Sequence, residues 1–169
     1  MNRRLCAVGA CLLLGGGLDV FVAAQDPAVK NHDHSFAANG GSPRMIAQTK
    51  TAALTTSSTA YAQLTAGTIT IPTGQTGYLK ATFSGESLCT GASWCTLRVR
   101  VDGVEMHPQV GTDFAFDSPS DSYEAHSIQR ISNRLGAGVH TVEVQWAVVG
   151  ASTFRLDDWL FQVEYWRVS

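Results

Sequence analysis

The stretch Thr153–Val168, TFRLDDWLFQVEYWRV, decides how this sequence is expected to fold. Phe154 and Leu156 alternate with polar residues, which is the pattern of a β-strand with one buried face. The alternation then resumes one residue out of phase, at Trp159, Phe161, Val163 and Tyr165. Because strand side chains alternate with a period of two, one extra residue must be absorbed. We predict a bulge or kink at Asp157 or Asp158.

Two further stretches carry strand signals. In residues 138–148, GVHTVEVQWAV, every second side chain is expected on the same face of a strand, and these are His140, Val142, Val144, Trp146 and Val148. Residues 97–106, LRVRVDGVEM, alternate and then turn at Asp102-Gly103, a dipeptide suited to the positive φ angles of a tight hairpin. No stretch shows a sustained helical period. Many short strands of this kind predict an all-β, antiparallel β-sandwich, and we favour the jelly-roll type.

The N-terminus has the pattern of an export signal. Arg3 and Arg4 precede an apolar stretch, and Val22 and Ala24 are small residues suited to a signal-peptidase site. We predict a signal peptide over residues 1–24 and a secreted, extracellular or periplasmic location. A membrane anchor and lipidation at Cys11 remain alternatives.

The rest of the chain divides in two by composition. Residues 25–43 are polar and irregular and predict a flexible leader, while residues 44–169 predict one β-sandwich domain. No segment after the signal is long and apolar enough to span a bilayer, so no membrane span is expected. The formal net charge is −2 without a basic run, which argues against nucleic acid as a partner.

Two cysteines, Cys89 and Cys95, remain after removal of the signal peptide. An even pair in an exported chain predicts a disulfide. A zinc site would need two more ligands, and redox centres usually have two residues between their cysteines rather than five. Trp94 precedes the second cysteine, and we expect it to pack over the bridge or to serve as a binding anchor.

Catalytic motifs are missing from the sequence. It contains no G-x-S-x-G nucleophile turn, phosphate loop or H-E-x-x-H pair. His107, His126 and His140 are available to a serine and an aspartate from elsewhere in the chain, so an unrecognised hydrolase remains the third hypothesis. We predict that the protein is not an enzyme.

The stretch DFAFDSPSDSYE, residues 113–124, is rich in acids. Oxygen-rich loops on β-sandwiches can hold calcium, which makes Asp113, Asp117 and Asp121 weak candidate ligands. Their spacing matches no established ligand pattern, and we expect a solvated acidic loop. We therefore predict no metal or other cofactor, with calcium as the alternative.

Several stretches in order, among them RVRVDGVE, AGVHTVEVQW and RLDDWLFQVEYW, resemble a family of secreted bacterial jelly-roll domains. Related domains occur in phage and bacterial fibre tips, and their plan is similar to that of tumour-necrosis-factor and complement globular heads. The resemblance spans residues 55–167 and implies a non-catalytic binding or structural module, often a homotrimer. No collagen-like or coiled-coil segment precedes the domain, which leaves the trimer open.

A second, local resemblance is to the end of carbohydrate-binding jelly rolls, carried by LGAGVHTVEVQW and FRLDDW. It implies that Asp157 or Asp158, together with Trp159, belongs to a sugar site. The Glu-rich opening strand of those modules is missing here. A secreted, non-catalytic module for extracellular binding or structural interaction is thus the first functional hypothesis, with an unknown protein or glycan surface as its partner, and a carbohydrate-binding module is the second.

Trp166 is the last candidate. Strand alternation sends its side chain to the face opposite Phe161 and Tyr165, which places it outside a sandwich. We predict that Trp166, with Trp94, forms a recognition patch for a partner surface or a sugar ring. The alternative is that the leader folds over Trp166.

Overall fold

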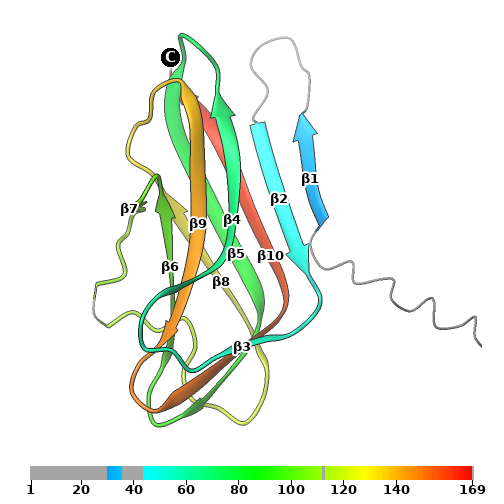
Figure 1. Ribbon diagram of the computed structural model, residues 1–169, viewed down its shortest axis with the longest axis vertical. Helices are drawn as coiled ribbons and strands as arrows, with labels where there is room; N and C mark the ends of the chain where they lie inside the picture. Colours follow the sequence, from blue (N-terminus) through cyan, green and yellow to red (C-terminus); the bar gives the residue numbers. More distant parts are fainter. Residues whose placement is uncertain (1–29, 36–43, 112, 169) are drawn as a thin grey trace, which may run out of the picture.

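The computed structural model describes residues 30–35, 44–111 and 113–168, which form strands and no helix. The strands make two sheets packed against each other (Figure 1). Sheet A contains, in order, β1 (Lys30–Ser35), β2 (Arg44–Lys50), β10 (Ser152–Val168), β5 (Thr76–Gly91) and β8 (Glu124–Ile131), with β3 (Leu54–Thr56) also paired to β10. Sheet B contains β4 (Ala62–Ile71), β9 (Gly138–Val148), β6 (Cys95–Val101) and β7 (Val104–Glu105).

The strands pair as a long hairpin that has been rolled up. β2 pairs with β10, β4 with β9, β5 with β8 and β6 with β7, all antiparallel, so that the outermost strands of the sequence enclose the inner ones. Nested pairing distributed over two sheets is the jelly-roll plan. The predicted fold class is confirmed.

Strand β1 lies within the stretch interpreted above as a leader. It pairs with β2 at the edge of sheet A, with Lys30 opposite Thr49 and Ser35 opposite Arg44. Residues 25–29 and 36–43 lie outside the described residues, as does the predicted signal peptide with Cys11. No helix that could cross a membrane occurs among the described residues.

Aromatic and branched side chains from both sheets fill the space between them. Phe83 of β5, Phe154 of β10 and Leu97 of β6 are fully buried. The ring of Phe83 lies 5.7 Å from that of Trp159, and the ring of Phe154 lies 5.8 Å from that of Trp146 in β9. The inward face predicted for residues 138–148 is confirmed, because its valines and Trp146 are buried.

Strand β10 contains the predicted break. Asp157 pairs with Glu86 and Leu160 pairs with Ser84, so two residues of β10 stand opposite Gly85 alone. Asp158 has a φ of 41°, the left-handed conformation that Asp tolerates better than most residues. The bulge brings Trp159, Phe161, Val163 and Tyr165 onto the same buried face as Phe154. The phase prediction is confirmed.

Gly85 is required opposite the bulge. A Cβ at this position would lie 2.8 Å from the Cβ of Trp159, closer than two carbons can approach. The absence of a side chain at Gly85 lets the indole of Trp159 enter the core beside the bulge. Glycines inside strands often mark such close approaches.

The two predicted local connections are also confirmed. Asp102 and Gly103 have φ angles of 49° and 83° and form the turn between β6 and β7. Cys89 and Cys95 form a disulfide with their Cα atoms 5.8 Å apart. Because Cys89 belongs to β5 and Cys95 to β6, the bridge ties sheet A to sheet B where the chain passes between them.

Candidate functional site

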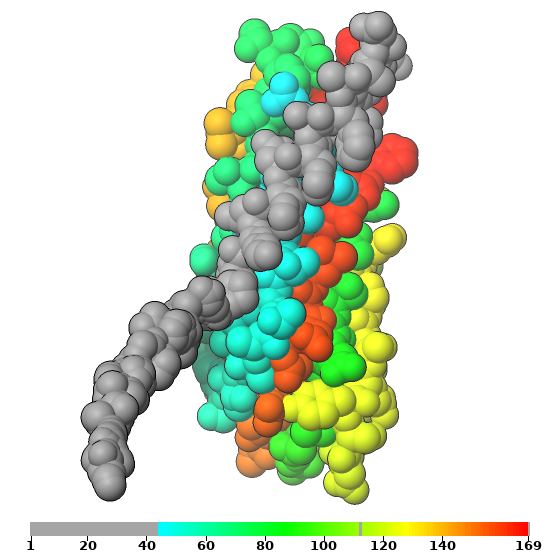
Figure 2. All heavy atoms as spheres, turned by 90° about the vertical axis from the view of Figure 1, so that its right-hand side faces the viewer, coloured from blue at the N-terminus to red at the C-terminus, as the bar shows by residue number. Residues whose placement is uncertain are grey.

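The outer face of sheet A carries an exposed group of large side chains near one end. Of the six large hydrophobic residues exposed in the described chain, Tyr78, Ile131 and Trp166 belong to this face, and Trp166 is the most exposed aromatic at 57%. Trp166 stands directly opposite Tyr78, and Ile131 stands opposite Lys80. Figure 2 shows the red end of β10 at the surface beside green β5. We call Tyr78, Lys80, Ile131, Glu164 and Trp166 the aromatic platform.

The indole of Trp166 is held in place by its neighbours. Its Nε1 donates a hydrogen bond to Oε2 of Glu164 at 3.0 Å, and the Lys80 ammonium lies 3.2 Å from the same oxygen. The Lys80 Nζ also lies 5.6 Å from the centre of the indole ring, within the range of a cation–π contact. These contacts fix a flat apolar surface between two charged groups that are themselves partly exposed.

The exposure predicted for Trp166 is confirmed, and sequence reasoning missed the other members of the platform. Tyr78 and Lys80 alternate with buried Leu79 and Ala81, so their outward direction was readable from the sequence. Their position beside Trp166 follows only from the pairing of β5 with β10. The described part of the leader, β1, lies beside β2 in sheet A, with β2 between it and β10.

Trp94 does not join this platform. It is half-buried and lines a hollow of about 200 Å³ on sheet B with Tyr61, Thr96 and Phe114 among others. Trp94 sits at the end of the sandwich that carries the disulfide, whereas Tyr78 lies eleven strand residues before Cys89 on β5. At about 3.3 Å per residue the two sites are roughly 35 Å apart. The predicted joint patch of Trp94 and Trp166 is therefore wrong.

The sugar site implied at the end of the chain is not assembled either. Trp159 is 2% exposed and packs on Phe83, because the bulge turns its side chain inward. Trp159 is thus a core residue and not a binding residue. Asp157 is half-buried, and its Oδ1 accepts a hydrogen bond from the backbone N–H of Asp158. The residue Asp158 itself is exposed.

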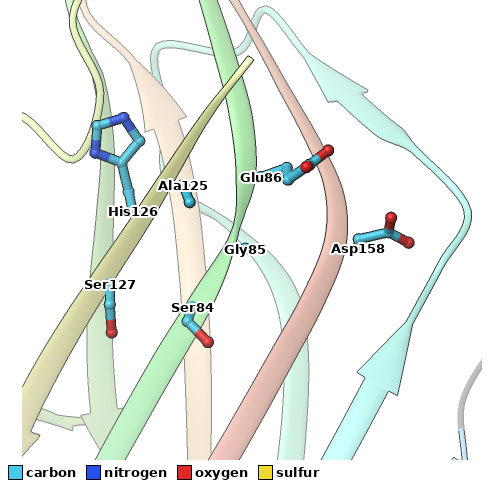
Figure 3. A pocket seen from close by; sticks show the side chains of 7 residues that line it. All are labelled: Ser84, Gly85, Glu86, Ala125, His126, Ser127 and Asp158. Atoms are coloured by element: carbon cyan, nitrogen blue, oxygen red, sulfur yellow. The ribbon is translucent and has the colours of Figure 1, made fainter.

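Asp158 borders an open hollow of about 340 Å³ on the outer face of sheet A with Ser84, Glu86 and Ser127 among its other lining residues. Figure 3 shows the ring of His126 directed away from Glu86 and Asp158. His126 also lines the hollow, but its ring is turned away from the acids and hydroxyl groups gathered there. This arrangement does not form a serine, histidine and acid relay.

The acidic loop departs from the expected solvated state at one residue. Asp113 and Asp121 are exposed, as predicted, but Asp117 is only 2% exposed. Its backbone exchanges hydrogen bonds with Cys95, and its Oδ2 accepts one from the Ser87 hydroxyl at 2.6 Å. Asp117 is buried because the loop is attached to β6, a pairing that its local sequence does not reveal.

His140 lies on β9 near the Asp102-Gly103 turn. Its Nδ1 is 2.7 Å from Oδ2 of Asp102, and its Nε2 is 3.0 Å from the carbonyl oxygen of Gly136. Burial lowers the pKa of His140, but the hydrogen bonds to both oxygens and the charge of Asp102 outweigh it, so the pKa is raised above its usual value. Two acceptors, one at each ring nitrogen, favour the doubly protonated imidazolium.

Replacing Asp102 with Asn is expected to lower the pKa of His140. Asn tolerates the positive φ of this turn, so the turn is retained while the charge is removed. A raised folded-state pKa stabilises the protein fully below about pH 6.5, the unfolded value, and this contribution is lost as pH rises through the folded pKa. The stability difference between wild type and D102N should thus shrink between pH 6 and pH 8. Ring-proton NMR titration and urea unfolding at both pH values test this; an unchanged titration would contradict it.

Comparison with known proteins places the chain in no family. No family model matches the sequence, and no curated protein matches it.

Proposed function

We propose that this chain is an exported, non-catalytic β-sandwich module that binds an extracellular partner through the aromatic platform. The observation that carries the proposal is Trp166, exposed yet fixed by Glu164 and Lys80. An ordered exposed aromatic loses little conformational freedom on binding, and Trp and Tyr are enriched where binding energy concentrates. The same logic supports a structural contact with a neighbouring copy.

A carbohydrate is the second candidate ligand, favoured by the polar surroundings of the rings. A sugar ring presents C–H groups on its faces and hydroxyl groups around its edge. Tyr78 and Trp166 provide ring faces, while Lys80 and Glu164 provide a donor and an acceptor beside them. An apolar face flanked by a few convergent polar groups is the usual composition of a small-ligand site.

Binding is favoured over hydrolysis by the state of the candidate catalytic groups. Ser87 is fully buried and its hydroxyl donates to Asp117, so it is not accessible to a substrate from solvent. His140 has both ring nitrogens engaged by Asp102 and Gly136. A nucleophile needs an accessible oxygen next to a free base.

Replacing Trp166 with Ala is expected to weaken partner binding at least about tenfold, because the central ring face is lost. Stability should change by no more than about 0.5 kcal/mol, since the side chain is largely exposed. Affinity electrophoresis against a panel of soluble polysaccharides measures glycan binding, and sedimentation velocity measures self-association. Tyr123→Ala, which removes an exposed aromatic outside the platform, is the matched control.

The outcomes separate the alternatives. Retarded migration in a polysaccharide, abolished by Trp166→Ala alone, supports the glycan. A reversible oligomer dissociated by the same variant supports contact between copies. Binding abolished by Trp94→Ala and unaffected by Trp166→Ala moves the site to the hollow on sheet B and overturns the platform.

A further inference from the structure

Three side chains near the disulfide end of the sandwich converge on one point. One ligand atom from each of Asp117, Glu124 and His126 lies within 4.8 Å of the other two, the one such group among the described residues. The Nε2 of His126 is 3.5 Å from Oδ1 of Asp117 and 3.5 Å from Oε2 of Glu124. Both distances are longer than a good hydrogen bond.

Two of the converging atoms are buried without a partner. Oδ1 of Asp117 and Nε2 of His126 have no hydrogen bond to any described residue, and Asp117 is 98% buried. A buried polar atom left without a partner costs about 1–3 kcal/mol, and more when it is charged. The arrangement therefore calls for a group that satisfies a carboxylate oxygen and an imidazole nitrogen together.

A divalent cation between them would do so. Zinc binds oxygen and nitrogen ligands at about 2.0–2.2 Å, and ligands arranged tetrahedrally at that distance stand about 3.4 Å from each other. The two 3.5 Å separations agree with that spacing. We propose that Asp117, Glu124 and His126 bind a divalent transition metal of the zinc class.

The surrounding structure positions these ligands. Ser87 holds the second oxygen of Asp117, and the Asp117 backbone is attached to Cys95, so this carboxylate is fixed. The ring of Phe116 packs 5.4 Å from that of His126. Partners that orient a ligand in this way raise metal affinity by 10–100-fold in characterised sites.

The choice of metal follows from the ligands. Calcium and magnesium take oxygen ligands, whereas imidazole suits zinc, copper, iron and nickel. His126 thus separates this site from the calcium site considered from the sequence, and Asp113 and Asp121 are not members of it. Glu124 is half-exposed, so a metal held here stays open to solvent and keeps a position for water or a ligand oxygen.

Isothermal titration of the metal-stripped mature chain with Zn²⁺ tests the proposal, with the visible absorption of Co²⁺ as a second readout. We expect one metal per chain. Glu124→Gln, at a half-exposed side chain, and Asp117→Asn, which keeps an acceptor for Ser87, should each weaken binding at least tenfold. Asp121→Asn, an acid from the same loop, is the matched control and should bind as wild type. Thermal unfolding confirms that each variant is folded.

Several results would overturn the site. These are no binding of either metal, binding unaffected by Glu124→Gln, or binding lost only when His32 and His34 of the N-terminal segment are replaced. A preference for Ca²⁺ over Zn²⁺ would overturn the metal class.

The metal site is distant from the aromatic platform. Ser87, which contacts the metal ligand Asp117, lies nine residues from Tyr78 on β5, roughly 30 Å away. Trp166→Ala should therefore leave metal binding unchanged, and the two proposals fail separately.

Discussion

Deleting Gln162 is expected to unfold the protein, whereas deleting Asp158 is expected to leave the fold intact. Both residues lie in β10, and neither side chain belongs to the core. Removing one residue from a regular strand sends every later side chain to the opposite face. Removing Asp158 instead deletes the extra residue of the bulge, after which Trp159 alone stands opposite Gly85 and the alternation is continuous.

The expected cost of deleting Gln162 approaches the whole stability of a domain. Val163 and Tyr165 would turn outward if the residues before the deletion kept their positions. If the strand instead compensated by losing the bulge, Trp159 and Phe161 would turn outward. Each large apolar side chain moved from core to water costs about 1.5–3 kcal/mol, and the polar residues forced inward add to this. Small domains are stable by only about 5–15 kcal/mol in total.

Circular dichroism and urea unfolding of the two deletion variants measure this difference. The Asp158 deletion is the matched control, because it shortens the same strand by the same amount. It should unfold cooperatively, with a modest decrease in the free energy of unfolding because the pairing of β2 and β3 with β10 is disturbed. A folded Gln162 deletion, or an unfolded Asp158 deletion, would contradict our account of the bulge.

Replacing both Cys89 and Cys95 with Ala is expected to lower the free energy of unfolding by about 2–5 kcal/mol. Chain entropy alone gives about 2 kcal/mol for so short a loop. The remainder arises because both residues are fully buried and their removal leaves space between the sheets. Equilibrium unfolding of the double variant, and of the wild type with and without reductant, measures the contribution of the bridge and that of the buried side chains.

The bridge also supports the loop that carries Asp117. Cys95 exchanges backbone hydrogen bonds with Asp117, and the N–H of Ser120 donates to the carbonyl oxygen of Cys89. The double variant should therefore bind Zn²⁺ more weakly than wild type even under conditions where it is folded. A double variant with wild-type stability would show that the disulfide is not a structural staple.

Features that depend on neighbouring residues in the chain were determined by the sequence. The one-residue slip in β10 fixed the bulge, since the alternation of side chains on a strand allows no other way to bury both halves. Asp102-Gly103 fixed a turn because few dipeptides tolerate its φ angles. Cys89 and Cys95, an even pair in a chain expected to be exported, predicted the disulfide. The outward direction of Trp166 followed from the same alternation.

Features that depend on partners across the sheets were decided by the tertiary structure. Tyr78 and Trp166 become neighbours although 87 residues lie between them, because the rolled hairpin pairs β5 with β10. Trp94 was separated from Trp166 because it precedes β6 of the other sheet, at the end of the sandwich that carries the disulfide. Asp117 was buried against Ser87 because its loop attaches to β6, which brought it to His126. Local sequence encodes which face a side chain takes, but the register between distant strands determines what it meets there.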